Sequence, residues 1–153
     1  MKAVIFDLDG ILLDSIEDLA DSMNIVLKNA GYPVHEIRSY KYFVGNGMEK
    51  LVYNALPEKC RNEDIIKRLT QKMIQEYNKR WNNKTRPYTG ISELLDRLTV
   101  MDIYMSVLSN KPDNFTKIIV KELLPNWQFS SVLGERKPIP RKPDPKGAIE
   151  IAH

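Results

Sequence analysis

The sequence has few of the features that would set it apart from ordinary globular proteins. Its 153 residues include one cysteine, Cys60, so no disulfide can form within the chain, which is typical of a reducing compartment. The first residues predict a strand, so we expect no basic and apolar leader, and no apolar run approaches the roughly 20 residues of a membrane helix. The net charge is only +3, with lysines and arginines spread among acids. We therefore expect a cytoplasmic protein that binds neither membranes nor nucleic acid.

The composition is that of a globular protein of about one domain. Apolar residues make up 42% of the chain and charged residues 28%. A chain of this length can bury one substantial hydrophobic core, but not two large ones.

Strand and helix patterns alternate in the two outer parts of the chain. β-Branched and aromatic runs predict strands, and apolar residues at helical spacing predict helices. The predicted strands cover residues 2–6, 103–108 and 129–133, and the predicted helices cover 91–98, 114–124 and a segment after Pro145. Alternation at this spacing predicts right-handed crossovers and an α/β fold with a parallel, Rossmann-like sheet.

The middle of the chain is predicted to be all helical. Helical spacing predicts helices over residues 15–30, 48–56 and 63–81, with Ser15 as an N-cap and Gly31 closing the first helix. Residues 81–90 are rich in turn formers and predict a linker. We therefore expect a helical insertion over residues 15–85, with residues 1–14 and 86–153 forming the sheet domain.

Polar side chains follow two of the predicted strands. Asp7 and Asp9 come after the first strand, and the stretch from Ser109 to Lys111 follows the strand over residues 103–108. In an open parallel sheet, ligands bind outside the carboxyl ends of the strands. The basic loop over residues 135–142 could reach the same edge from the last strand. The sequence thus places several polar groups at one edge of the sheet.

The chemistry that needs this set is phosphoryl transfer. One aspartate can attack phosphorus and form an acyl phosphate, and a second can protonate the leaving oxygen and later activate water. A magnesium ion would relieve repulsion between two carboxylates and a phosphate dianion. Hydroxyl and ammonium groups would hold the equatorial oxygens.

Five stretches carry a resemblance to the haloacid dehalogenase superfamily of phosphatases. VIFDLDGILLDS (residues 4–15) resembles the family's first motif, VLSNKP (107–112) the second and RKPDP (141–145) the third. FVGNG (43–47) and RPYTGI (86–91) are similar to phosphoglycolate phosphatases and close relatives such as β-phosphoglucomutase. The resemblance spans nearly the whole chain and implies a Rossmann-like core with an α-helical cap domain.

The resemblance implies a role for each residue of the three motifs. Asp7 would be the nucleophile and Asp9 the general acid and base. The Asp7 carboxylate and the Asp9 backbone carbonyl would contribute to a Mg²⁺ site. Ser109 would hydrogen-bond the transferring phosphoryl group, and Lys142 would neutralise charge on that group and on Asp7.

The resemblance also implies candidates for substrate binding. Gly45, Asn46 and Gly47 match the cap loop that closes over the substrate in this subfamily. Asn110 and Lys111 would flank the phosphate.

Two departures from the family pattern stand out. Ile11 replaces the usual threonine or valine, which keeps branching and apolar bulk. Family members also have a fourth, acidic motif that completes the magnesium site, whereas the only acids after Lys142 are Asp144 and Glu150. We therefore expect a chain truncated before that motif, with weak magnesium binding and an uncovered sheet edge that favours association, including a homodimer.

Each candidate also has a plainer interpretation. The aspartate pair could cap a loop, and Ser109 could cap a helix. Asn110 could be a turn residue and Lys142 a solvated charge. Gly45 and Gly47 could form only a turn.

Three functions remain open at this stage. The first is a Mg²⁺-dependent phosphomonoester hydrolase acting on a small phosphorylated metabolite such as phosphoglycolate. The second is a phosphosugar mutase similar to β-phosphoglucomutase, which would return a rearranged phosphate ester instead of free phosphate. The third is a catalytically incomplete fragment that associates with partners through the sheet edge.

Overall fold

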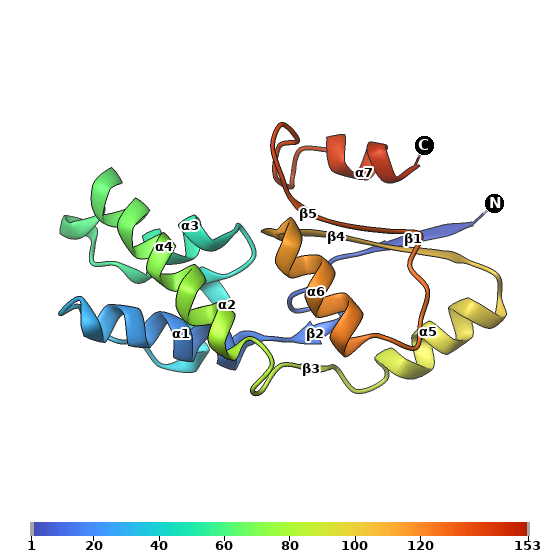
Figure 1. Cartoon of the computed structure of the whole chain (residues 1–153), viewed down its shortest axis with the longest axis horizontal. Coiled ribbons are helices and arrows are strands. Elements are labelled where there is room, and N and C mark those ends of the chain that lie inside the picture. The colour runs from blue at the N-terminus through green and yellow to red at the C-terminus, as the bar shows by residue number, and fades with distance from the viewer. Residues whose placement is uncertain (1, 153) are drawn as a thin grey trace. The chain divides into compact units, whose positions relative to one another are not determined.

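The chain divides into two compact units, which we describe separately. The computed structural model describes residues 2–152. The first unit consists of Met1–Asp14 with Arg86–His153, and the second of Ser15–Thr85. We call them the sheet unit and the helical unit (Figure 1).

The sheet unit is built on three parallel strands in the order β1-β4-β5. Their bounds are Ala3–Phe6 for β1, Tyr104–Pro112 for β4 and Ser131–Glu135 for β5. The register places Phe6 opposite Val107 and Leu108 opposite Leu133. The predicted α/β class with a parallel sheet is confirmed.

Helices pack against the central strand of this sheet. They are α5 (Ile91–Val100), α6 (Asp113–Leu123) and α7 (Lys146–Ala152). In β4, every residue from Met105 to Lys111 is buried, as expected for a strand with a neighbour on each edge and helices packed against it. Helix α6 turns Phe115, Ile119 and Val120 inward and runs beside β4 and β5 (Figure 1). The sheet unit therefore has its own hydrophobic core.

Strand β4 is longer than the sequence predicts. The expected end was residue 108, but the strand continues to Pro112, which pairs with Glu135 after an irregularity in the register. Residues 109–111, expected just beyond a strand, therefore lie within an irregular strand end.

A second, two-stranded sheet was not predicted. Strand β2 (Leu13–Asp14) pairs antiparallel with β3 (Arg86–Pro87). These are the residues at which the chain leaves the sheet unit and returns to it. Strands of two residues carry no periodic signal, so the sequence pattern could not reveal them.

The helical unit contains four α-helices and a short 3-10 helix among its described residues. They are α1 (Ile16–Asn29), α2 (Ile37–Phe43), α3 (Met48–Ala55), η1 (Glu58–Cys60) and α4 (Glu63–Arg80). The buried faces of α1 and α4 follow helical spacing and pack together, which confirms the predicted helical insertion. Helix α2 was missed because Tyr40 is the only residue of its seven that is buried.

The two ends of α1 differ in how well the sequence predicted them. Gly31, at φ +76°, closes the helix as expected: its N–H donates to Lys28 O (3.1 Å), and Tyr32 N–H donates to Leu27 O (2.9 Å). Ser15 occupies the N-cap position as expected, but its side chain makes no capping hydrogen bond.

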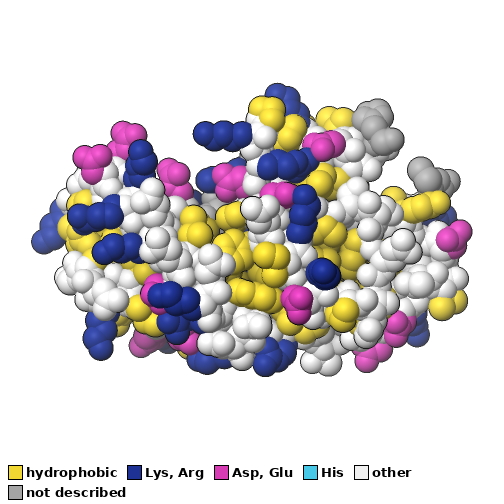
Figure 2. All heavy atoms as spheres, viewed as in Figure 1, with side chains coloured by type: hydrophobic (Ala, Val, Ile, Leu, Met, Phe, Trp, Pro, Cys, Tyr) yellow, Lys and Arg dark blue, Asp and Glu magenta, His cyan; other side chains and the backbone are white. Residues whose placement is uncertain are grey.

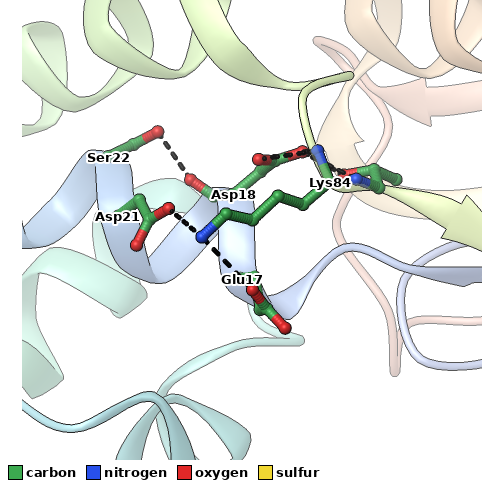
Figure 3. Close-up of polar contacts among 6 residues, drawn as sticks. Glu17, Asp18, Asp21, Ser22 and Lys84 are labelled. Atoms are coloured by element: carbon green, nitrogen blue, oxygen red, sulfur yellow. Dashed lines mark hydrogen bonds and ion pairs between the residues drawn. The ribbon is translucent and has the colours of Figure 1, made fainter.

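Asp18 ties the first turn of α1 to the last residues of the helical unit (Figure 3). Its side chain is buried, and Oδ2 accepts hydrogen bonds from Lys84 N (2.9 Å), Thr85 N (2.8 Å) and Thr85 Oγ1 (2.7 Å). The Lys84 ammonium extends along α1 to Asp21 (2.8 Å) and Glu17 (3.2 Å). This set of contacts, which we call the Asp18 cluster, fixes the start of the helical unit to its end.

Candidate active site

The two aspartates of the first motif follow β1 and enter a tight turn. Leu13 N–H donates to Leu8 O (3.0 Å), and Gly10 N–H donates to Leu13 O (2.9 Å). Gly10 has φ +80°, in the left-handed region where a side chain is strained. The turn holds Asp7 and Asp9 at the carboxyl end of the strand, where open parallel sheets bind ligands.

Lys142 reaches Asp7 from the loop after β5. Its Nζ lies 2.7 Å from Asp7 Oδ1 and donates to Leu108 O at 2.8 Å. Asp7 Oδ1 also accepts a hydrogen bond from Leu8 N–H (2.8 Å). Although 135 positions separate Asp7 from Lys142, the structure brings these two predicted residues into direct contact.

Lys111 forms the matching pair with Asp9. The Lys111 Nζ lies 3.0 Å from Asp9 Oδ1, and the lysine side chain is only 2% exposed. Burying an ammonium group is costly unless it is paired, so the ion pair with Asp9 keeps the Lys111 side chain at this edge of the sheet. Each carboxylate therefore has its own cation, and the repulsion between Asp7 and Asp9 is offset.

Ser109 and Asn110 complete the group at the end of β4. Both are buried. Ser109 Oγ accepts a hydrogen bond from Lys111 N–H (3.1 Å), which leaves the hydroxyl hydrogen available to donate. The Asn110 amide hydrogen-bonds the backbone of Lys142.

A pocket in the sheet unit opens beside Ser109, Asn110 and Lys142. Arg136 and Arg141 also line it. Each arginine is held by an acid: Arg136 by Glu150 (2.5 Å) and Arg141 by Glu135 (2.6 Å). Glu135 and Asp144 line the same pocket, so its cations are largely balanced by acids.

Gly45, Asn46 and Gly47 lie in the helical unit, between α2 and α3. Gly45 and Gly47 have φ of +111° and +85°. Both values fall in the left-handed region, so the backbone here requires glycine whatever the loop contacts. Their role in substrate binding stays a prediction.

Tyr88 lies close enough to the aspartates to respond to their charge, and the sequence analysis did not single it out. Burial raises the pKa of its hydroxyl, and the charges of Asp14 and then Asp9 raise it further. Its N–H donates to Leu12 O (3.1 Å), which anchors it to the turn after β1. The only available signal was its place inside the RPYTGI stretch.

The donors at this edge are of the class that magnesium prefers. Mg²⁺ in proteins is typically bound by one or two carboxylates with water and substrate phosphate oxygens. Asp7 would supply a carboxylate and Asp9 its backbone carbonyl, as the resemblance to the family implies. Among residues 2–152, no cluster of three or more His, Cys, Asp or Glu side chains could hold a metal ion. The residues present fit magnesium as a partial set of ligands.

Comparison with known proteins identifies the family. Residues 4–152 match the family model of haloacid dehalogenase-like hydrolases. The chain belongs to this family. Its parallel sheet, its helical insertion and the lysine-paired aspartates lie within the matched region.

The relatives within the family include phosphoglycolate phosphatases. The chain is 29% identical to that of Aliivibrio fischeri over 95% of its own length and 66% of the relative's. It is 32% identical to the phosphoglycolate phosphatase of Psychrobacter arcticus, over 98% of its own length and 68% of the relative's. A crystal structure of a predicted phosphoglycolate phosphatase from Haemophilus somnus superposes with a TM-score of 0.89 at 28% identity, covering 99% of this chain and 70% of that one. Within the family the chain is therefore phosphoglycolate phosphatase-like, and it spans 54 to 68% of the length of such curated relatives.

Charges of both signs are mixed on the surface of the chain. On the face in Figure 2, lysines and arginines are interspersed with acids in both units. Within the described part of the chain, no helix has both the length and the apolar character needed to span a bilayer.

Proposed function

We propose that the sheet unit carries the site of a phosphomonoester hydrolase that acts on a small phosphorylated metabolite such as phosphoglycolate. The observation that supports this most is the pairing of each aspartate with its own lysine at the carboxyl end of β1. Family membership and the relatives' names point to the same chemistry.

In the first step, a carboxylate oxygen of Asp7 attacks phosphorus. The new bond joins this oxygen to phosphorus, and the bond from phosphorus to the ester oxygen breaks. Asp9 protonates the departing oxygen, so the product alcohol leaves neutral. An aspartyl phosphate on Asp7 remains.

Lys142 and Ser109 act on the phosphoryl group during this step. The ammonium already contacts Asp7, so it orients the attacking carboxylate and offsets negative charge on the phosphoryl oxygens. The Ser109 hydroxyl is oriented by Lys111 N–H and donates to one of those oxygens. Both groups are held before the substrate arrives, which avoids reorganisation during the reaction.

In the second step, water attacks phosphorus and Asp9 takes a proton from it. The bond between phosphorus and the Asp7 oxygen breaks, which frees phosphate and restores the carboxylate. Lys111 holds the Asp9 side chain in place through both proton transfers.

Asp7 and Asp9 would also hold a magnesium ion. When bound, the ion would offset the negative charge that two carboxylates and a phosphate dianion bring together.

The test is phosphate release from phosphoglycolate, measured with and without Mg²⁺. The chain is compared with Asp7→Asn and with Asp64→Asn, an exposed aspartate of α4 that serves as a matched control. We expect magnesium-dependent release from the chain and the control, and none from Asp7→Asn.

Other outcomes would contradict parts of the proposal. Equal release from Asp7→Asn would exclude Asp7 as the nucleophile. A rearranged phosphate ester without free phosphate, tested on a phosphosugar, would indicate a mutase. No turnover from any of the proteins would mean that this chain alone does not form a working site.

A further inference from the structure

We propose that Asn110 is a positioning residue that holds Lys142 against Asp7, and not a residue that binds substrate. The inference rests on the proposed function for the meaning of the Lys142–Asp7 pair. Its structural basis is a set of contacts inside the sheet unit that the motif assignments do not explain.

The Asn110 side chain uses both ends of its amide on a single residue. Lys142 N–H donates to Asn110 Oδ1 at 2.8 Å, and Asn110 Nδ2 donates to Lys142 O at 3.2 Å. The amide thus pairs with the N–H and C=O of Lys142 as a neighbouring strand would. These contacts join the end of β4 to a segment 32 residues further along the chain.

Lys142 needs such support because it lies in an irregular loop. Residues 136–145 belong to no helix or strand, so no regular backbone ladder fixes the position of Lys142. A lysine side chain has about 2 kcal/mol of rotamer entropy to lose when it is fixed in one place. Without an anchored backbone, the ammonium would sample many positions away from Asp7.

Residues of β4 bind Lys142 at two points, its backbone and its ammonium group. The Asn110 side chain hydrogen-bonds the Lys142 backbone, while Leu108 O accepts a hydrogen bond from Lys142 Nζ at 2.8 Å. Asn110 is itself buried, with 6% of its surface exposed, so water competes little for its hydrogen bonds. The ammonium is thereby directed to Asp7 Oδ1 at 2.7 Å.

The two roles for Asn110 predict different results. If Asn110 binds substrate, its removal should weaken substrate binding and leave Lys142 in place. If it positions Lys142, its removal should free Lys142 from Asp7. Misplacing a catalytic group by about 1 Å can cost on the order of 10²-fold in rate.

The first experiment follows Lys142 directly by NMR of the ¹⁵N-labelled chain. We expect hydrogen exchange at the Lys142 backbone N–H to be about tenfold faster in Asn110→Ala, because a buried hydrogen bond is lost. We also expect the Asp7→Asn substitution to shift the Lys142 ammonium signal strongly in the natural background and only weakly in Asn110→Ala. Asn126→Ala, which removes an exposed asparagine, is the matched control and should change neither signal.

A second variant keeps the test decisive if Asn110→Ala does not fold. Asn110→Asp retains the oxygen that accepts from Lys142 N–H but sets a carboxylate oxygen against Lys142 O. We expect it to keep the slow exchange at Lys142 N–H and to lose part of the response to Asp7→Asn. An ammonium response to Asp7→Asn that is the same in all Asn110 backgrounds would overturn the proposal.

These signals do not depend on turnover, so they separate this inference from the proposed function. If the chain releases phosphate, Asn110→Ala should lower kcat by about 10- to 100-fold with KM within about twofold. A raised KM with unchanged kcat would overturn the positioning role. If the natural chain shows no release while the Lys142 signals behave as described, the proposed function fails for this chain and the positioning of Lys142 stands.

Discussion

The Lys142 ammonium lies between Asp7 Oδ1, at 2.7 Å, and the carbonyl oxygen of Leu108, at 2.8 Å. One cation thus joins the aspartate after β1 to the backbone of β4. A point charge on a flexible stem fits between these two acceptors, whereas a planar guanidinium is larger and needs a different geometry.

We therefore expect Lys142→Met to lower phosphate release by about 10²- to 10³-fold, and Lys142→Arg not to restore it. The rate would be measured with phosphoglycolate and Mg²⁺. Lys146→Met, which removes an exposed lysine of the neighbouring helix α7, is the control and should keep the natural rate. A Lys142→Met rate close to that of the control would contradict a catalytic role.

The Lys111–Asp9 pair should contribute to stability as a unit. Because the Lys111 side chain is 2% exposed and Asp9 is 20% exposed, losing one partner leaves the other charge poorly solvated. We expect a double-mutant cycle with Lys111→Met and Asp9→Asn to give a coupling of about 1–3 kcal/mol in the free energy of unfolding by urea.

The exposed Arg38–Glu36 pair, measured in the same way, should show little coupling. Equal coupling in both pairs would indicate that the burial of Lys111 does not strengthen its interaction with Asp9.

Gly134 in β5 allows a close approach of the backbone at the end of β4 and the start of α6. A Cβ at this position would lie 2.5 Å from Asp113 Cα, Lys111 O and Thr116 Oγ1. Two of these atoms belong to the backbone, so they cannot move without shifting β4 or α6. We expect Gly134→Ala to lower the free energy of unfolding by about 1–3 kcal/mol.

Gly147→Ala is the control, measured by urea unfolding at the same pH. Its Cβ would meet a Leu108 methyl group at 3.0 Å, and alanine favours the helix α7 by up to about 1 kcal/mol. We expect a clearly smaller loss at this position, and equal losses at the two glycines would contradict the backbone clash.

The sequence predicted the parallel sheet because its signals are local. Runs such as residues 103–108 identify buried strands, and the helices between them limit the topology to parallel crossovers. The helical insertion was visible for the same reason, since α1 and α4 have clear apolar faces.

What escaped sequence analysis depends on contacts between distant residues. The motif positions suggested that Lys142 acts on Asp7, but nothing local indicates that Lys111 pairs with Asp9 or that Asn110 holds the Lys142 backbone. Both contacts depend on the directions in which the side chains of residues 109–111 point, and the irregular end of β4 sets those directions. A one-residue change in that irregularity would exchange their directions.

Asp113 should make stability depend on pH in the acid range. Burial alone raises the pKa of its carboxyl, but hydrogen bonds from Lys117 and Gly134 N–H, with the charges of Lys117 and Arg136, lower that pKa overall. The stabilisation is therefore complete above the unfolded pKa of about 3.9 and is lost as pH falls through the lower folded value.

We expect Asp113→Asn to be less stable than the natural chain at pH 6, with the difference shrinking as the pH falls below about 4. Urea unfolding at a series of pH values measures this. Lys117→Met, which removes one cause of the lowered pKa, should show a smaller change in the same direction. A stability difference that does not vary between pH 6 and pH 2 would contradict the assignment.

Within the Asp18 cluster, the hydrogen bonds to the Asp18 carboxylate should stabilise the helical unit far more than the ion pairs of Lys84. Asp18→Ala removes the buried acceptor, so the N–H groups of Lys84 and Thr85 and the Thr85 hydroxyl lose their partner. We expect a loss of about 2–4 kcal/mol in the free energy of unfolding by urea, with faster hydrogen exchange at Thr85 N–H. Asp21→Ala is the matched control, because it removes only an exposed partner of the Lys84 ammonium and should change stability little. If the two variants were equally stable, the buried hydrogen bonds of Asp18 would contribute no more than a surface ion pair.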